Sequence, residues 1–280
     1  MLSSTDDHLT FEVSSMSRLR IVAPRVYVAS SLLYLTNSVV IEGSSHNGLV
    51  IDPAVTVKDL ISLGIDLRKA ELRTEAGFST HAHWDHVLWN PALGNAPRYA
   101  TDSAIQSLQA HRDAMFAEMV RVAPGHPPDL FGRGRLTPLP PEMHCVPWSG
   151  PLVQLMRHSA HAPGHAALFV QESGVLICGD MLSDVEIPLL DLTASDPLKD
   201  YRDGLHLLST VDPELRIFIP GHGHVGYGNK EFQYRIGADL KYLDSLEEGL
   251  TCTDSRLSVP WLQAEHNTQW SHFHGHNEPK

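Results

Sequence analysis

The chain has 280 residues, of which 42% are hydrophobic and 19% are charged, and its formal net charge is −12 with histidine neutral. This length and balance indicate a soluble globular protein with one large core or two tightly fused halves. The negative charge argues against a nucleic-acid partner, because phosphate binding relies on many Lys and Arg contacts. No apolar run reaches the length of a membrane span, and the three cysteines indicate no disulfide framework.

The first 17 residues are polar and acidic, and we expect them to form a flexible N-terminus. They lack the basic start and apolar centre of a secretory signal. We therefore expect a cytoplasmic protein.

The predicted elements alternate between strands and helices in two halves of similar build. In the first half we expect strands within 20–28 and 38–52 and near 78–81 and 99–100, and helices over 55–63 and from 102 to 108. In the second half we expect strands at 152–156, 166–171, 175–178 and 216–219, and helices at 201–210 and 232–246. This order predicts an α/β or mixed (α+β) layered domain.

One short segment concentrates side chains that can bind metal. His81, His83, Asp85 and His86 follow an apolar, β-prone run. Side chains alternate in an extended segment, so His81 and His83 point to the same side, and a following helical turn would bring Asp85 and His86 toward the same space. Imidazole and carboxylate suit zinc, and to a lesser degree iron or manganese. The segment can therefore serve two neighbouring metal positions.

Further candidate ligands follow downstream in a repeated pattern, in which an apolar run ends in a Gly or Pro turn beside a His or Asp. They are His161 and His165 in His-Ala-Pro-Gly-His, Asp180 in Cys-Gly-Asp, and His222 with His224 in Gly-His-Gly-His. Ligands on loops at strand ends are typical of a rigid scaffold with one functional edge.

This order of motifs resembles the metallo-β-lactamase-fold hydrolase superfamily over nearly the whole chain. The resemblance implies a four-layer αβ/βα sandwich with the metals along one edge of two facing sheets. It also implies that His81, His83 and His165 bind one metal, that Asp85, His86 and His222 bind a second, and that Asp180 bridges them. Asp52 would support the site from behind the ligands. Between His161 and His165, the Pro-Gly-His context favours His165.

The segment 110–141 stands apart, and we interpret it either as a connector whose apolar stripe packs into the core or as a lid over the metal site. In the lid interpretation, an apolar part of the substrate would contact residues of this segment and its surroundings: Trp84, Met115, Phe116, Met119 and Phe131. His224 is a further candidate for substrate contact or proton donation, and a surface role is its alternative.

We expect the catalytic domain to cover residues 18–250, and residues 251–280 to form a C-terminal extension with a His-rich tail. His272, His274 and His276 have ligand-like spacing, but no apolar strand precedes them. We interpret this cluster as a disordered tail or an adventitious metal binder.

The predicted function is hydrolysis of a small ester-like bond, a lactone or thioester, by hydroxide held between two zinc ions, with Asp85 and Asp180 orienting that hydroxide. The His and Asp ligand set is similar to that of the lactonase and glyoxalase II-like branches. The alternatives are a mononuclear iron enzyme of the persulfide dioxygenase type, a β-lactam or phosphodiester hydrolase, and a non-enzymatic metal-binding protein. Candidates for a general acid are Tyr201, Tyr227, His224 and His158.

The expected cofactor is Zn²⁺, two ions per chain, with iron or manganese as alternatives. The expected partner is a small-molecule substrate, with neither nucleic acid nor membrane. The sequence leaves the oligomeric state open, a homodimer included.

Overall fold

The computed structural model describes residues 18–275, apart from residues 54, 129–130, 132–135 and 212. The elements of the first half are β1 (Arg20–Ala23), β2 (Val26–Ser30), β3 (Asn37–Glu42), β4 (Asn47–Ile51), α1 (Val57–Lys69), β5 (Arg73–Phe78), η1 (Pro91–Leu93), β6 (Arg98–Thr101), α2 (Asp102–Val122) and β7 (Leu136–Leu139). Those of the second half are β8 (Gln154–Arg157), β9 (Ala166–Val170), β10 (Val175–Gly179), α3 (Pro197–Ser209), β11 (Ile217–Pro220), β12 (Gly226–Tyr227), α4 (Gly228–Glu248), η3 (Ser255–Ser258) and α5 (Pro260–His274).

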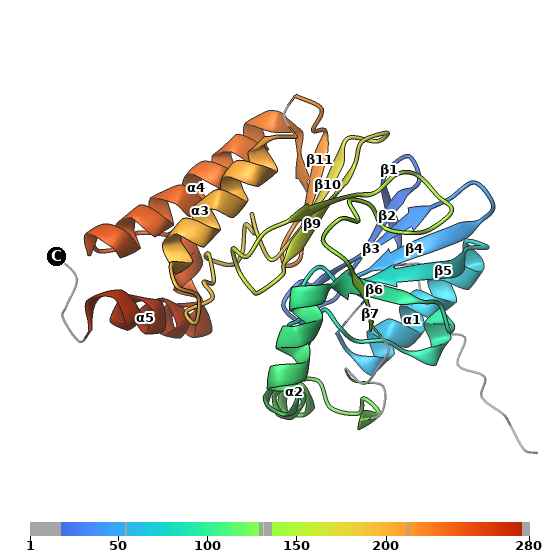
Figure 1. Cartoon of the computed structure of the whole chain (residues 1–280), viewed down its shortest axis with the longest axis horizontal. Coiled ribbons are helices and arrows are strands. Elements are labelled where there is room, and N and C mark those ends of the chain that lie inside the picture. The colour runs from blue at the N-terminus through green and yellow to red at the C-terminus, as the bar shows by residue number, and fades with distance from the viewer. Residues whose placement is uncertain (1–17, 54, 129–130, 132–135, 212, 276–280) are drawn as a thin grey trace, which may run out of the picture.

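Two sheets face each other and carry helices on their outer sides (Figure 1). The first sheet has the strand order β1-β2-β3-β4-β5-β6-β7, and the second has the order β12-β11-β10-β9-β8. One buried cluster fills the space between the sheets, with Ile41, Leu49 and Phe78 from the first and Leu168 and Ile177 from the second. The other two buried clusters lie under the helices on the outer faces. The prediction of a four-layer αβ/βα sandwich is confirmed.

The helices begin where the sequence supplies caps. Thr56 accepts a hydrogen bond from the backbone N–H of Asp59 at the start of α1, and Asp196 does the same for Lys199 at the start of α3. Such caps satisfy N–H groups that have no partner inside the helix. Leu60, Leu63 and Leu67 then return to one face of α1 at helical spacing and are buried against the first sheet. Capping and spacing together place α1 on the sheet.

The segment 110–141 has no boundary of its own in the structure. Its first part belongs to α2, which begins at Asp102, and its last part forms β7, the edge strand that pairs in parallel with β6. Phe131 is buried in the cluster beneath α2. The part of the segment that the structure describes is therefore built into the first sheet and its covering helix.

The interpretation of the C-terminal histidines as a disordered tail is wrong for the residues described. His272 and His274 lie in α5, and His274 Nε2 donates a hydrogen bond to the backbone oxygen of Leu246, 2.5 Å away. Leu262 and Trp270 of α5 are buried in the cluster that also contains residues of α3 and α4. His276 and residues 1–17 lie outside the described residues.

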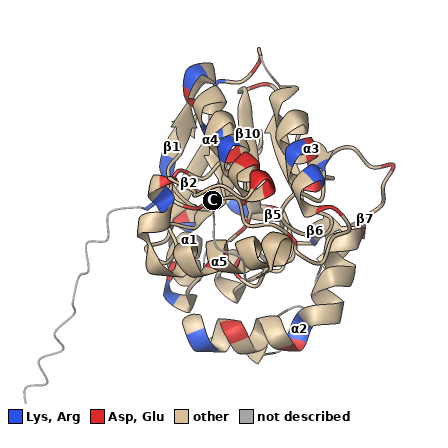
Figure 2. Ribbon diagram, turned by 90° about the vertical axis from the view of Figure 1, so that its left-hand side faces the viewer, with Lys and Arg blue, Asp and Glu red and all other residues tan. Residues whose placement is uncertain are grey.

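Acidic and basic residues alternate along the ribbons of the outer helices α2, α3 and α4 (Figure 2). Arg202 of α3, for example, pairs with Asp244 and Glu247 of α4 at 2.8 and 2.7 Å. Of the helices that the structure describes, none is long and apolar enough to cross a membrane.

Candidate metal centre

The ligand candidates meet because the strands that carry them end at one edge. β4 and β5 run parallel in the first sheet, and β10 and β11 run parallel in the second. Parallel strands end at the same edge of their sheet. Asp52 follows β4, the segment 79–86 follows β5, Asp180 follows β10, and His222 follows β11. Residues far apart in sequence thereby converge on one place.

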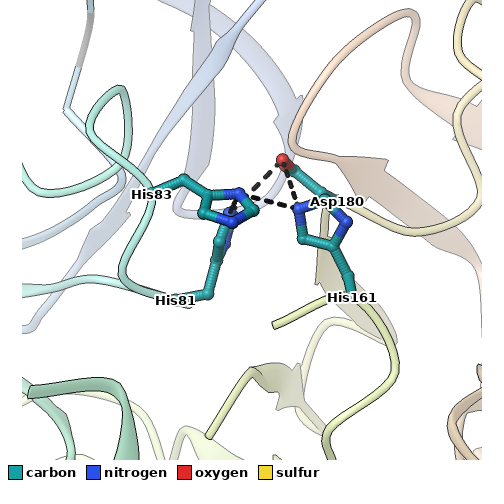
Figure 3. A group of neighbouring side chains, drawn as sticks. All are labelled: His81, His83, His161 and Asp180. Carbon is teal, nitrogen blue, oxygen red and sulfur yellow. Dashed lines mark hydrogen bonds and ion pairs between the residues drawn. The ribbon is translucent and has the colours of Figure 1, made fainter. Parts of the chain in front are cut away.

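Four of these side chains form a first group that combines His81, His83, His161 and Asp180. Their polar ends point toward one another (Figure 3). His83 Nδ1 lies 3.1 Å from His81 Nε2 and 2.9 Å from His161 Nε2. Asp180 Oδ2 lies 3.3 Å from His81 Nε2 and 3.4 Å from His161 Nε2. We refer to these four residues as group one.

A second group combines Asp85, His86 and His222. His86 Nε2 lies 3.2 Å from His222 Nε2, and Asp85 Oδ2 lies 3.6 and 3.3 Å from these two nitrogens. Asp180 contacts this group as well, with Oδ1 at 3.1 Å from His86 Nε2 and Oδ2 at 3.3 Å from His222 Nε2. Asp180 therefore stands between the two groups, where the resemblance placed a bridging carboxylate.

The structure reverses our preference for His165 over His161. His161 reaches group one, whereas His165 lies behind it, with its ring 4.9 Å from that of His81 and 4.4 Å from that of His158. The reason is the backbone. The strand β9 begins at Ala166, and His165 precedes it with its Nε2 directed at the backbone of Gly179. His161 lies in the preceding turn, which faces the edge.

The outward nitrogens of the ligand histidines have fixed partners. His161 Nδ1–H donates to the backbone oxygen of Leu189 at 2.7 Å, and His222 Nδ1–H donates to that of Tyr34 at 3.1 Å. A carbonyl oxygen can only accept, so these bonds fix the tautomer and leave Nε2 facing the centre.

Asp52 lies behind two histidines of the donor groups. Its carboxylate accepts from the backbone N–H and the hydroxyl of Thr80, at 2.8 and 2.6 Å, and its Oδ2 lies 3.1 Å from His86 Nδ1. The hydroxyl oxygen of Thr80 in turn lies 3.1 Å from His81 Nδ1. One buried carboxylate thus orients a histidine in each group.

Burial and the neighbouring charges lower the pKa values of two histidines at the centre, His81 and His83, and raise those of two others, His86 and His222. Burial, with the nearby His161, lowers the pKa of His83 to about 3, and burial with His86 lowers that of His81 well below its usual range. Burial opposes the charged form of His86 and His222 too, but Asp180 and the other carboxylates raise both pKa values well above normal. His81 and His83 are thus neutral imidazoles, which is the form that binds metal.

The donor set fits metal ions. Imidazole nitrogens that face one another at 2.9–3.2 Å either share a proton or hold a cation between them. Tetrahedral coordination with bonds of ~2.0 Å separates neighbouring donors by roughly 3.3 Å. The donor separations in group one, 2.9 to 3.4 Å, agree with that spacing. The buried Asp180 Oδ1 also has no hydrogen-bond partner among the described residues. Each group could therefore hold one divalent cation, with Asp180 shared.

Two glycines leave room for the side chains that pack against them at the centre. A Cβ on Gly221 would lie 2.0 Å from Asp180 Oδ1. A Cβ on Gly179, whose φ is +57°, would lie 2.0 Å from His165 Nε2. Any other residue at either position would displace the carboxylate or the backbone that carries it.

Several predicted substrate contacts belong to the protein core. Trp84, Met119 and Phe131 are buried in the cluster beneath α1 and α2, so the structure gives them a packing role. Met115 and Phe116 are partly buried against the same cluster. The lid interpretation therefore fails for the three buried side chains.

The candidates for a general acid lie in different surroundings. Tyr201 is buried in the cluster beneath α3 and α4, and Tyr227 is 55% exposed. His158 lies behind His165, and burial together with His161 lowers its pKa to about 3. His224 is exposed and pairs with Asp184 at 2.9 Å. None of these four residues belongs to either donor group.

Two residues beside His222 were not predicted from the sequence. Tyr34 supplies the carbonyl described above, and Glu186 Oε1 lies 3.8 Å from His222 Nδ1. Burial, opposed by His222, raises the pKa of Glu186 to about 7. Neither residue stands in a motif, and Tyr34 lies in an apolar run between two strands. No sequence signal separates them from ordinary loop residues.

Known proteins share the fold and the sequence pattern. The sequence profile of the metallo-beta-lactamase superfamily matches residues 33–222. A probable metallo-hydrolase of Bacillus subtilis, YqjP, is 39% identical over 70 residues, which are 22% of this chain and 21% of that relative.

Solved structures agree over most of the chain. A metallo-beta-lactamase family protein from Thermus thermophilus has a TM-score of 0.63 at 19% identity and covers 89% of this chain and 92% of its own. A beta-lactamase domain protein from Burkholderia ambifaria has a TM-score of 0.62 at 19% identity, over 86% and 80%. With the profile covering most of the chain and the donor groups at the sheet edge, the chain belongs to the metallo-beta-lactamase superfamily.

Proposed function

We propose that this protein is a hydrolase that holds two zinc ions and cleaves a small ester-like bond, a lactone or a thioester. The observation that carries the proposal is the pair of donor groups with Asp180 between them. His81, His83, His161 and Asp180 would hold one ion, and Asp85, His86, His222 and Asp180 the other. Bound there, the ions would supply a water molecule acidified enough to attack at neutral pH and a Lewis acid for the attacked oxygen.

The residues of the chain prepare the site for that chemistry. Opposing burial, His86 and His222 lower the pKa values of Asp85 and Asp180, so both carboxylates are ionised. Ionised carboxylates can accept hydrogen bonds from a nucleophilic water and hold it in place. Among the donors, His83 is partly exposed, and we infer that a substrate reaches the centre from its side.

The chemistry of the donors supports hydrolysis at a carbon centre. All seven side chains are His or Asp, a set similar to that of lactonases and glyoxalase II-like enzymes. Cys178, two residues before Asp180, is not among them, because it is buried in the core and burial raises its pKa. We therefore place the substrate among lactones and thioesters.

Metal analysis with a hydrolysis panel tests the proposal. We expect about two zinc ions per purified chain, turnover of a lactone or thioester, loss of turnover on chelation, and its return with zinc. His83→Ala and Asp180→Ala should each abolish turnover, whereas the exposed His272→Ala should not. Full activity in metal-free protein would contradict the mechanism. One iron ion per chain, with oxygen consumption and no hydrolysis, would favour the persulfide dioxygenase type instead.

A further inference from the structure

The loop between β2 and β3 holds an unusual backbone beside the metal centre. Tyr34 and Leu35 have φ values of +55° and +49°, a conformation that side chains other than glycine rarely adopt. Hydrogen bonds from Gly223 N to Leu35 O and from His222 Nδ1 to Tyr34 O, both 3.1 Å long, keep the loop in this form. Backbone strain of this kind persists where the surrounding structure fixes it, and it concentrates at functional sites.

The strained backbone places the Tyr34 ring next to a ligand. The rings of Tyr34 and His222 lie 6.2 Å apart with an interplanar angle of 79°. The Tyr34 ring therefore lies directly beside the second donor group.

The C-terminal extension brings a second aromatic ring to the same place. Trp261, in the first turn of α5, lies 5.8 Å from the Tyr34 ring at a tilt of 56° and is 39% exposed. α5 is anchored beside the site, since Gln269 donates to Pro188 O and accepts from Leu190 N. The position of Trp261 is thus set by contacts within the fold. Trp261 lies outside residues 33–222, which the superfamily profile matches.

We propose that Tyr34 and Trp261 bind the apolar part of the substrate, an aromatic or bulky acyl group next to the bond that is cleaved. The inference rests on the proposed function and names the substrate class within it. The same loop exposes a further apolar side chain, Leu32, which is 92% exposed and lies two residues before Tyr34. Apolar surface next to a site of converging polar groups is typical of substrate recognition.

A matched pair of thioesters tests the inference. Phenylacetyl and acetyl esters of one thiol are compared in the wild type, Trp261→Ala, Trp261→Phe and Tyr34→Ala, with the exposed Tyr234→Ala of α4 as control. We expect Trp261→Ala to lose about tenfold more kcat/KM on the phenylacetyl than on the acetyl thioester, because one aromatic contact is removed. Trp261→Phe should recover most of that difference, and Tyr234→Ala should show none.

Binding of phenylacetate to the zinc-loaded protein gives a readout independent of turnover. Calorimetry should show binding to the wild type that is about tenfold weaker in Trp261→Ala. Equal losses on both thioesters, unchanged phenylacetate binding in Trp261→Ala, or no binding to the wild type would each overturn the inference. If neither thioester is hydrolysed while phenylacetate binding still depends on Trp261, the proposed function fails and the apolar subsite remains.

Discussion

The two candidate histidines on one loop, His161 and His165, give the sharpest test of the metal centre. His161 Nε2 lies 2.9 Å from His83 Nδ1 and 3.4 Å from Asp180 Oδ2, whereas His165 has both ring nitrogens buried without a hydrogen-bond partner in the described residues. We expect His161→Ala to lose one metal ion and His165→Ala to keep both.

The size of the effect follows from the ligand count. Binding of a zinc ion by four protein ligands is worth about 10–16 kcal/mol. One ligand of four then carries roughly 3 kcal/mol, or about 100-fold in affinity. His165→Ala removes no donor from either group and no hydrogen bond to a ligand, so zinc affinity should change by less than the roughly tenfold lower limit for residues that hold a ligand in place. It does remove a buried ring, so its melting temperature should fall.

Zinc competition with a chromophoric chelator, combined with metal analysis, measures both variants. Thermal unfolding of the metal-free proteins separates loss of a ligand from loss of stability. If His165→Ala lost the ion and His161→Ala kept it, the assignment of group one would be refuted, and the preference drawn from the Pro-Gly-His motif would be restored.

Three further outcomes are expected. Gly221→Ala should lower zinc content and turnover while the fold persists, because its Cβ would lie 2.0 Å from Asp180 Oδ1; normal zinc content would contradict this. Asp52→Asn should weaken zinc binding by about 10–100-fold in competition titrations, because His86 loses its charged partner. His158 has its pKa lowered to about 3 in the folded chain, below the unfolded value of ~6.5, so its contribution to stability is present above pH 6.5 and is lost as the pH falls toward 3. Urea unfolding of metal-free protein at pH 7 and 5 should show a loss about 2 kcal/mol smaller in His158→Asn than in the wild type.

Most of the layered fold could be predicted from local patterns. The apolar spacing over 232–246 predicted a helix that the structure extends to Gly228–Glu248, and the runs at 166–171 and 175–178 form β9 and β10. The C-terminal helix α5 was missed because its sequence is polar and has no strong apolar face. Tertiary packing stabilises this helix, because Leu262 and Trp270 are buried in the cluster formed by α3, α4 and their neighbours.

Six of the seven expected ligands lie in the two donor groups, because the segments that carry them follow strands that end at one edge. The choice between His161 and His165 could not, because both lie in one turn and only the start of β9 at Ala166 decides which faces the edge. The carbonyls that fix the ligands were also beyond sequence reasoning. A backbone oxygen carries no residue signature, so the roles of Tyr34 O and Leu189 O depend on loop geometry alone.

The C-terminal extension supports the same geometry from outside. The loop after Asp180 provides Leu189 O, which orients His161, and two extension side chains hold this loop. Arg256 Nη1 donates to Ser183 O and Glu186 O at 3.0 and 2.8 Å, and Gln269 donates to Pro188 O. Both donor side chains are buried, and a buried donor without a partner costs free energy. Their hydrogen bonds to the loop carbonyls therefore hold the loop in place. The extension therefore helps to shape the candidate metal centre. It holds the loop that carries Leu189 O, and this carbonyl orients the His161 imidazole.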